Sequence, residues 1–297
     1  MDIKDLSISM ETIPYIKLYS GKTFVVKYGG SIMKSEKHQK AFIEDVSRLK
    51  SMGINLVIVH GGGPEINRWL QRAGIESNFV NGLRVTDRET MEIVEMVLSG
   101  HVNKRIAANL SRNGVNAIGI SGRDSNLIRA KHKFLYEEDE VIDIGYVGEV
   151  TSINKNLLED LIDRDYVPVI SPVGCDSKGN VYNINADYAA SFISSVLNAE
   201  KLIILTDVEG VYKDINDKSS FISSISKEEI KEYIDEGIIT GGMIPKMECC
   251  IDAIENGTKN VHLIDGRKEH SLLLDIFNGS GTRIMGKEVL EECQRVI

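Results

Sequence analysis

The chain has 297 residues, of which 42% are hydrophobic, and its formal net charge is −9. This composition is typical of a folded protein with one large core or two lobes, and it argues against intrinsic disorder. The acidic balance, without clusters of Lys and Arg, disfavours a nucleic-acid or anionic-membrane surface, so we expect no partner of either kind.

Residues 1–20 precede the first predicted strand. Their apolar and polar side chains follow the pattern of a partly amphipathic helix that is interrupted near Pro14. The segment lacks the basic and long apolar regions of a secretion signal, and no apolar run in the chain approaches the roughly 20 residues of a membrane span. We therefore expect a cytoplasmic protein whose N-terminal helical arm packs on its own body or on another subunit.

The first strand opens into a glycine turn. Phe24, Val25 and Val26 are followed by Lys27, and then by Gly29 and Gly30 ahead of a helical pattern. Because glycine has no Cβ, backbone N–H groups in such a turn can approach an anion, and the following helix start adds partial positive charge. The stretch predicts a phosphate site. A lysine that simply extends to solvent from the strand end is the alternative, and this stretch alone does not decide between them.

A second stretch repeats this layout one helix later. After a helix predicted over 36–51, the apolar run 56–59 leads through His60 into Gly61, Gly62 and Gly63, and then into Pro64. In a parallel sheet both glycine turns open at the carboxyl edge, where α/β proteins bind ligands. Neither stretch matches the P-loop or dinucleotide-binding fingerprints.

The following segment is predicted to hold helices and one turn. A helix over 64–73 ends at Gly74, and the turn 81–85 carries Arg84, which we expect to be exposed at an edge. Thr86 and Glu89 have the spacing of a capping box that opens the next helix. Another helix is predicted from His101 to Asn113.

Residues 127–150 break the alternation of strands and helices. After a strand over 116–120, the stretches 127–133 and 141–150 predict antiparallel hairpins, a candidate flap over the site. The acidic residues between them, 137–140, are read as a solvated loop.

Alternation then resumes with a helix from Asn154 and a strand over 167–171. Asn185 is predicted to cap the next helix, and Asp187 falls in its first turn. A carboxylate there gains roughly 0.3–1 kcal/mol from the helix dipole, so capping alone could explain Asp187.

The last hundred residues predict another set of strands and helices. These are a strand over 201–205, a turn over 206–212, a helix capped by Ser226 and Glu229, a glycine turn over 240–246 leading into a helix, a strand over 261–264 and a helix near 270–277. The four cysteines include no C-x-x-C pair, so we expect neither a zinc site nor a disulfide framework. Adjacent Cys249 and Cys250 are read as packing residues.

The fold class predicted from these elements is α/β. We expect an open αβα sandwich with a mainly parallel sheet running through two lobes, plus β-hairpins and an N-terminal helix. The predicted divisions are the arm at 1–20, an amino-acid-substrate lobe at 21–195 and a nucleotide-binding lobe at 196–297.

Three charged residues stand out at the predicted sheet edge, Lys27, Asp187 and Lys246, with no histidine base or metal-ligand cluster beside them. Phosphoryl transfer to a carboxylate needs no general base, because an acid with a pKa near 4 is already ionised at neutral pH. It does need cations to neutralise the transferring phosphoryl group. Two lysines held by one aspartate would supply them.

Five motifs in order resemble the amino-acid kinase superfamily and, within it, the N-acetylglutamate kinase family. They are Lys27-Tyr28-Gly29-Gly30-Ser31, Val59-His60-Gly61-Gly62-Gly63-Pro64, Asn81-Gly82-Leu83-Arg84-Val85-Thr86, Asn183-Ile184-Asn185-Ala186-Asp187 and Gly241-Gly242-Met243-Ile244-Pro245-Lys246. The resemblance covers nearly the whole chain. It implies ATP-dependent phosphorylation of the side-chain carboxylate of N-acetyl-L-glutamate in arginine biosynthesis, with Mg²⁺ arriving on ATP and no protein-built metal site.

The resemblance also implies roles for individual residues. Lys27 and Lys246 would stabilise the transition state and Asp187 would organise them. The substrate-binding residues would be Gly62, Gly63, Arg84 and Asn183, with Arg84 on the α-carboxylate and Asn183 near the acylated amine. The nucleotide-binding residues would be Gly29, Gly30, Thr206, Asp207, Gly210, Val211, Thr240, Gly241 and Gly242.

The N-terminal arm resembles the extra helix of the arginine-inhibited members of this family. In those members the helix links homodimers into a hexamer. The resemblance therefore implies feedback inhibition by L-arginine, with Tyr15 of the arm and Thr282 of the segment 279–282 as effector residues.

Two alternatives remain at this point. One is a related kinase that acts on aminoadipate attached to a carrier protein, for which an acidic carrier would need a basic rim that this acidic chain does not suggest. The other is a catalytically silent nucleotide-binding subunit, which the presence of both lysines and the aspartate disfavours.

Overall fold

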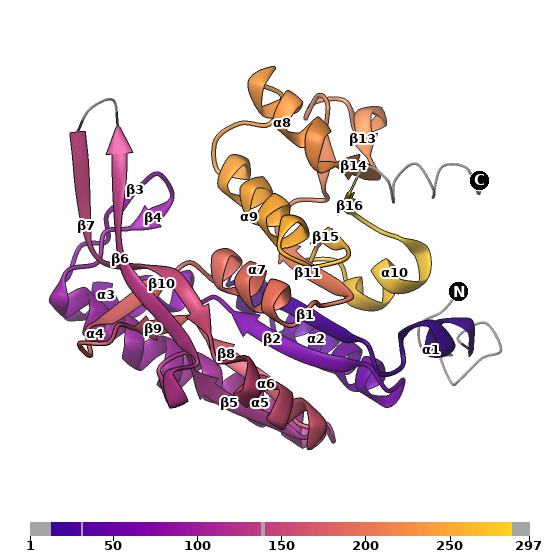
Figure 1. Ribbon diagram of the computed structural model, residues 1–297, viewed down its shortest axis with the longest axis horizontal. Helices are drawn as coiled ribbons and strands as arrows, with labels where there is room; N and C mark the ends of the chain where they lie inside the picture. The colour runs from indigo at the N-terminus through magenta and orange to yellow at the C-terminus, as the bar shows by residue number, and fades with distance from the viewer. Residues whose placement is uncertain (1–12, 31, 138–139, 287–297) are drawn as a thin grey trace.

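The computed structural model describes residues 13–30, 32–137 and 140–286. Predictions that fall on 1–12, on Ser31, on Glu138 and Asp139 of the acidic run, and on Cys293 therefore lie outside the described residues. A single eight-stranded sheet forms the centre of the molecule, in the order β14-β16-β15-β11-β1-β2-β8-β5 (Figure 1). Its strands are β1 (Thr23–Tyr28), β2 (Asn55–His60), β5 (Ala117–Ser121), β8 (Val167–Ser171), β11 (Lys201–Thr206), β14 (Ser224–Ser226), β15 (Val261–Asp265) and β16 (Thr282–Met285).

Every neighbouring pair in this sheet is parallel except β15 with β16. This confirms the predicted α/β class with a mainly parallel sheet. The central strands are covered on both faces, which is why their sequences are nearly continuous apolar runs and do not alternate with polar residues. Strand β1 joins the two halves of the sheet, because Lys27 lies beside Val59 of β2 on one side and Ile204 of β11 on the other.

Helices cover the sheet on both faces. Alternate residues of β1 and β2 face opposite ways, so that Phe24 and Leu56 pack in one hydrophobic cluster and Val25 and Val57 in the other. The first cluster receives α2 (Glu36–Ser51), α3 (Gly63–Ala73), α4 (Arg88–Glu95), α5 (Asn103–Arg112) and α10 (Ser271–Asn278). The second receives α6 (Lys155–Asp163), α7 (Ala186–Val196), α8 (Lys227–Asp235) and α9 (Met243–Glu255). The buried Cys249 and Cys250 lie in α9, as packing residues would.

A second group of strands lies to one side of the sheet. Strands β6 (Ile128–Glu137) and β7 (Glu140–Ile153) form the long antiparallel hairpin that the sequence predicted, and Figure 1 shows it projecting from the left of the molecule. They close on themselves with β9 (Val173–Cys175) and β10 (Val181–Ile184). The two short strands β9 and β10 were not predicted. A smaller hairpin, β3 (Phe79–Val80) with β4 (Leu83–Arg84), lies beside the long one.

The helix after β4 begins differently from the prediction. Its N-cap is Asp87, whose carboxylate accepts from the backbone N–H of Thr90. Thr86 is fully buried, and its hydroxyl donates to the carbonyl of Arg84 at 2.8 Å and accepts from the side-chain amide of Asn183, so its contacts lie away from the start of the helix. Helix α4 then runs through a π-helical segment (Met96–Val102) into α5 without a break.

The predicted capping box of Ser226 and Glu229 is present at the start of α8. The remaining short elements are β12 (Val211–Tyr212), β13 (Phe221–Ile222) and the 3-10 turns Ile32–Lys34, Asp124–Asn126 and Lys218–Ser220. No helix in the described part of the chain combines the length and the apolar character that crossing a membrane requires.

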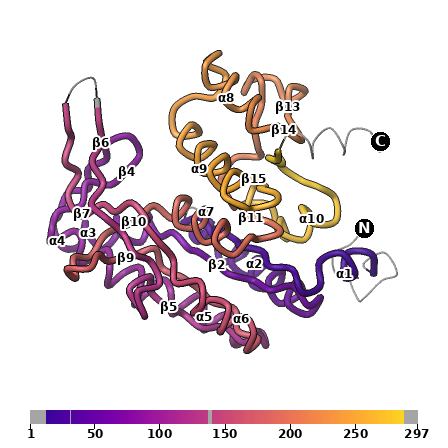
Figure 2. The backbone as a smooth tube through the Cα atoms, viewed as in Figure 1, coloured from indigo at the N-terminus to yellow at the C-terminus, as the bar shows by residue number. Residues whose placement is uncertain are grey.

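The described part of the N-terminal arm is the helix α1 (Ile13–Tyr19). The Tyr15 hydroxyl donates to the carbonyl of Phe277 in α10 at 3.0 Å, and the ring of Tyr19 lies 5.2 Å from that of Phe24 in β1. The arm therefore packs on its own subunit, and Figure 2 shows it at the opposite end of the molecule from the hairpin β6–β7.

Candidate active site

Two glycine turns meet at the carboxyl ends of β1 and β2. A Cβ atom on Gly30 would lie 2.9 Å from Pro64 Cδ and 3.2 Å from the backbone nitrogen of Gly63, and one on Gly29 would lie 2.8 Å from the carbonyl oxygen of Leu205. A side chain at either position would therefore displace a neighbour. The backbone of the turn after β1 therefore lies next to the backbone of the turn after β2.

Asp187 lies between the two lysines at this edge. Its Oδ1 is 2.9 Å from Lys27 Nζ and its Oδ2 is 2.8 Å from Lys246 Nζ. The three side chains are only 12%, 14% and 17% exposed for Lys27, Asp187 and Lys246 respectively. Each residue reaches the cluster from a different element, namely β1, the first turn of α7 and the first turn of α9.

The electrostatics of this cluster are those of a shared counter-ion. Burial by itself would raise the pKa of Asp187, but the charges of Lys27 and Lys246 outweigh it and hold that pKa below the usual range. Burial would lower the pKa of Lys246, and the charge of Asp187 raises it above its ordinary value. At neutral pH the cluster thus carries two positive charges and one negative charge.

Asp187 is not the N-cap of its helix. The N-cap of α7 is Asn185, whose side chain accepts from the backbone N–H of Asp187 at 2.8 Å. The carboxylate of Asp187 is engaged by the two ammonium groups, so the dipole of α7 and both lysines act on the same anion.

A cavity of about 770 Å³ adjoins the cluster. Its lining includes Asp187, Lys246, Gly241 and Gly242, together with residues of the two hairpins. The hairpin residues are Asn81, Gly82, Leu83, Lys133 and Leu135. The predicted flap β6–β7 therefore contributes directly to the wall of the cavity.

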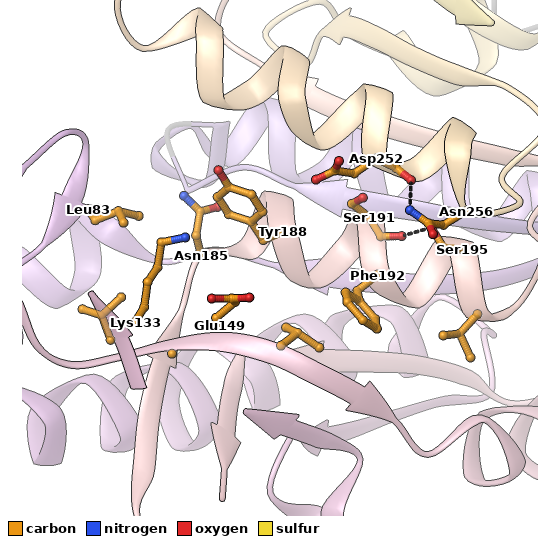
Figure 3. A pocket seen from close by; sticks show the side chains of 14 residues that line it. Leu83, Lys133, Glu149, Asn185, Tyr188, Ser191, Phe192, Ser195, Asp252 and Asn256 are labelled. Carbon is orange, nitrogen blue, oxygen red and sulfur yellow. Dashed lines mark hydrogen bonds between the residues drawn. The ribbon is translucent and has the colours of Figure 1, made fainter. Parts of the chain in front are cut away.

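A second cavity of about 660 Å³ continues along α7 and shares Leu83, Lys133, Asn185 and Tyr188 with the first. Figure 3 shows Lys133 extending from the hairpin toward Asn185 and Tyr188, with Asp252 and Asn256 on the opposite wall. Lys133 Nζ lies 5.1 Å from the centre of the Tyr188 ring. Neither Lys133 nor Tyr188 was predicted as a site residue, although Tyr188 directly follows Asp187 in the sequence.

Arg84 is placed differently from the prediction. It is buried, with only 7% of its surface exposed, and was expected to be exposed at an edge. Its guanidinium stacks over the ring of Phe79 at 4.7 Å and donates to Ser77 Oγ and to the carbonyl of Gly63. The hairpin β3–β4 folds the arginine back onto the glycine turn. Burial lowers its pKa to about 10, which leaves it charged at neutral pH.

Asn183 joins the same region from β10. Its side-chain amide donates to the hydroxyl of Thr86 at 3.2 Å, two residues beyond Arg84. A chain of hydrogen bonds therefore links Asn183 through Thr86 and Arg84 to Gly63, although these residues are far apart in the sequence.

Of the predicted nucleotide-binding residues, Gly29 and Gly30 lie in the turn after β1, and the others lie at or after the end of β11 and before α9. Thr206 ends β11, beside β1, and its hydroxyl approaches Asp207 Oδ1 at 3.4 Å. Thr240, Gly241 and Gly242 precede α9 and are exposed. Gly210 is buried, and the backbone N–H of Val211 donates to the hydroxyl of Thr282 at 2.9 Å.

The two predicted effector residues lie on different elements. Tyr15 contacts α10, whereas Thr282 begins β16 and is fully buried. The Thr282 hydroxyl also donates to the carbonyl of Ile222 at 2.6 Å, so its hydrogen-bonding capacity is used within the fold. The effector roles of both residues stay predictions.

No group of three or more His, Cys, Asp or Glu side chains within 13–30, 32–137 and 140–286 could hold a metal ion. The residues predicted to bind phosphate are two lysines and the glycines of the turns.

Comparison with known proteins shows which family this chain resembles. Residues 22–265 match the model of the amino acid kinase family. An acetylglutamate kinase of Clostridium acetobutylicum is 61% identical over 279 residues, covering 94% of this chain and 94% of that protein. One from Thermoanaerobacter pseudethanolicus is 50% identical, covering 98% of this chain and 96% of that protein.

Among solved structures, N-acetylglutamate synthase of Neisseria gonorrhoeae, complexed with coenzyme A and N-acetyl-glutamate, matches with a TM-score of 0.80 at 24% identity. The match covers 93% of this chain and 62% of the synthase, so this chain spans less than two thirds of that protein, and at this identity the likeness shows the fold alone. The family model matches residues 22–265, and the two kinases cover 94% and 98% of the chain. The chain therefore belongs to the amino acid kinase family and, within it, to the acetylglutamate kinases.

Proposed function

We propose that this protein transfers the γ-phosphoryl group of ATP to the side-chain carboxylate of N-acetyl-L-glutamate, giving N-acetyl-L-glutamyl 5-phosphate and ADP as a step of arginine biosynthesis. The observation that carries the proposal is the buried Asp187 with an ammonium group on each carboxylate oxygen. The substrate is inferred from the two acetylglutamate kinases to which this chain is similar.

The proposed reaction needs little covalent help from the protein. A carboxylate oxygen of the acceptor attacks the γ-phosphorus, the bond to the oxygen bridging the β- and γ-phosphates breaks, and ADP leaves with the electron pair. No proton has to move, because the acceptor is already ionised at neutral pH. What the transfer demands is positive charge at the equatorial oxygens of the migrating group.

Lys27 and Lys246 are suited to this task because Asp187 keeps both in place. An ammonium group has three donors, so each lysine can contact Asp187 and still offer donors to the phosphoryl group. The low exposure of all three side chains strengthens these interactions relative to water. The glycine turns at Gly29–Gly30 and Gly62–Gly63 would add backbone N–H groups.

On the acceptor side, Arg84 would pair through its planar guanidinium with the α-carboxylate, and Asn183 would contact the acetylated amine. On the nucleotide side we assign Thr206, Asp207, Gly210, Val211 and Thr240–Gly242, with Mg²⁺ arriving on ATP. The burial of Arg84 against the Phe79 ring supports a fixed orientation for its fork.

One assay tests the proposal. The protein is incubated with Mg-ATP, hydroxylamine and one acceptor, and the hydroxamate formed from the acyl phosphate is measured. We expect N-acetylglutamate to give far more product than free glutamate, aspartate or carbamate. Equal or greater product with another acceptor would refute the substrate assignment, and no product with any acceptor would refute phosphoryl transfer to a carboxylate.

We further propose cytoplasmic location, inhibition by L-arginine and assembly of homodimers into a hexamer through the N-terminal arm. Helix α1 packs on α10 through Tyr15 but leaves Ile13 and Leu18 41% and 57% exposed. Apolar side chains on a short exposed helix support a role in contact with another subunit.

A further inference from the structure

A buried histidine lies directly before the triple glycine, and the chemistry proposed above does not use it. His60 is the last residue of β2 and is completely buried. Its Nδ1 lies 2.8 Å from the carbonyl oxygen of Gly61, and its Nε2 lies 3.1 Å from Nδ2 of Asn103. Asn103, the first residue of α5, is completely buried as well.

The neighbouring polar groups fix the proton on the histidine ring. The amide nitrogen of Asn103 also donates to the carbonyls of Val169 at 2.8 Å and Ile120 at 3.2 Å. The opposite amide orientation would set an oxygen against these two acceptors. The carbonyl of Gly61 can only accept, so Nδ1 carries the hydrogen. In the neutral ring Nε2 is then unprotonated, and it faces the Asn103 amide, whose two hydrogens are shared among Nε2 and the two carbonyls.

His60 therefore donates from Nδ1 to the carbonyl of Gly61. Burial lowers the pKa of His60 to about 4, so the ring stays neutral at neutral pH and keeps this single arrangement. A fixed donor on a rigid ring holds the carbonyl of the next residue in one direction.

This hydrogen bond also sets the direction of the N–H of Gly62. The carbonyl of Gly61 and the N–H of Gly62 belong to one planar peptide and point in opposite directions when it is trans. All peptides within the described residues are trans. Because the carbonyl is turned toward the imidazole of His60, the N–H of Gly62 is turned away from it.

The nitrogen of Gly62 faces the glycine turn after β1. A Cβ atom on Gly30 would lie 3.3 Å from the nitrogen of Gly62 and 3.2 Å from that of Gly63. Within the described part of the chain, neither of these N–H groups donates to a protein acceptor. Both are left for a ligand at the edge where Lys27 lies.

The packing outside this turn keeps it in place. The π-helical segment Met96–Val102 directly precedes Asn103, and a Cβ atom on Gly62 would collide with its Leu98. On the far side, a Cβ atom on Gly119 of β5 would collide with Oδ1 of Asn103. π-Helical turns are rare and recur near functional sites.

We propose that His60, itself held by Asn103, is a positioning residue that aims the N–H of Gly62 at the phosphoryl group during its transfer. The proposal rests on the function proposed above and adds to it a residue that touches neither substrate.

The test compares two substitutions of similar size. In His60→Asn the side-chain amide can occupy the place of Nδ1 and donate to Gly61, whereas His60→Leu cannot donate. We expect kcat for acyl phosphate formation to fall about 10- to 100-fold in His60→Leu and to stay within about threefold of wild type in His60→Asn. The KM values for ATP and the acceptor should change by less than about threefold in both.

Two further variants separate positioning from stability. Gly119→Ala should displace Asn103 from outside the site and lower kcat with His60 intact. Ser194→Ala removes a buried hydrogen bond of 2.7 Å to Thr258 from α7, on the opposite face of the sheet from α5, and it should lower Tm without changing kcat. In the wild-type protein, the ¹⁵N NMR spectrum of the histidine ring should show Nδ1 protonated and Nε2 unprotonated at about pH 7.

The outcomes are distinct. An active wild type whose His60→Leu variant keeps its kcat, or in which His60→Leu and His60→Asn lose kcat equally, overturns the positioning role alone. If His60→Leu does not fold, a normal kcat in Gly119→Ala overturns it. The opposite ring tautomer would also overturn it, whereas a wild type that forms no acyl phosphate refutes the proposed function and, with it, this inference.

Discussion

Replacing Lys246 with alanine is the most direct perturbation of the proposed charge cluster. The substitution removes an ammonium group that lies 2.8 Å from Asp187 and is 17% exposed, and it leaves Lys27 as the single partner of that carboxylate. The first consequence is electrostatic. The cluster changes from a net charge of about +1 to about 0 just where the migrating phosphoryl group gathers negative charge.

The size of the effect can be estimated from Coulomb's law. Two unit charges about 4 Å apart in an effective permittivity of about 20 interact by roughly 4 kcal/mol. Since each 1.36 kcal/mol changes a rate about tenfold, full loss of this interaction would cost about 10³ in kcat. Partial replacement by water reduces the effect, so we expect kcat to fall about 10²- to 10³-fold, with the KM for ATP changed by less than about threefold.

The assay is hydroxamate formation under saturating Mg-ATP and N-acetylglutamate, with nucleotide affinity measured separately by calorimetry. Lys259→Ala is the matched control, because it also removes a lysine paired with a carboxylate, Glu200 at 2.9 Å, but at a side chain that is 58% exposed. We expect wild-type kcat in this control. A Lys246→Ala enzyme with kcat within about fivefold of wild type would show that the second ammonium group does not stabilise the transition state.

Three other predictions concern the acceptor, the pH and the arm. Arg84→Lys should raise the KM for N-acetylglutamate about 10-fold or more and leave the KM for ATP nearly unchanged, because the charge remains while the planar fork is lost; equal effects on both constants would argue against a contact with the acceptor. The pKa of Asp187 is lowered in the folded protein, so its ion pairs stabilise the fold at pH values above its unfolded pKa of about 4 and are lost as the pH falls through the folded value. Below about pH 4, Tm should therefore fall more steeply with acid in the wild type than in Asp187→Asn. Parallel Tm curves for the two proteins would contradict this prediction. Deleting residues 1–20 should leave active dimers that L-arginine no longer inhibits, and hexamers that persist in light scattering after the deletion would refute the role of the arm.

Much of the sheet could be predicted because its strands are local and apolar. The runs ending at Lys27, His60 and Leu205 are each followed by glycine or polar turns, and strands buried on both faces leave this signature whatever their neighbours are. The order of the strands was not accessible in the same way, because it depends on which helices cross which face. The short strands β9 and β10 were missed since three or four residues contain too little periodicity to recognise.

The residues of the site, like the strands, could be predicted only where the local sequence carries the signal. Glycines and lysines at strand ends could be singled out from their positions alone, and the structure brings Lys27 and Lys246 to the same carboxylate. The burial of Arg84 could not be foreseen, because it depends on the hairpin β3–β4 folding back onto Gly63. Thr86 was misread for a similar reason. It has the right spacing for a cap, but its buried hydroxyl is committed to Arg84 and Asn183.

The residues that line the cavity come from two kinds of element, which differ in how far they can change without disturbing the sheet. Asp187 and Lys246 come from helices α7 and α9, which pack on the central sheet, whereas Leu83, Lys133 and Leu135 come from two hairpins outside that sheet. Mutations in the hairpins can therefore reshape the space for an acceptor while the lysines and the aspartate keep their positions. After gene duplication, a descendant of such a chain could acquire a new acid as its acceptor through hairpin changes alone, and laboratory evolution of altered specificity should begin with libraries at these positions.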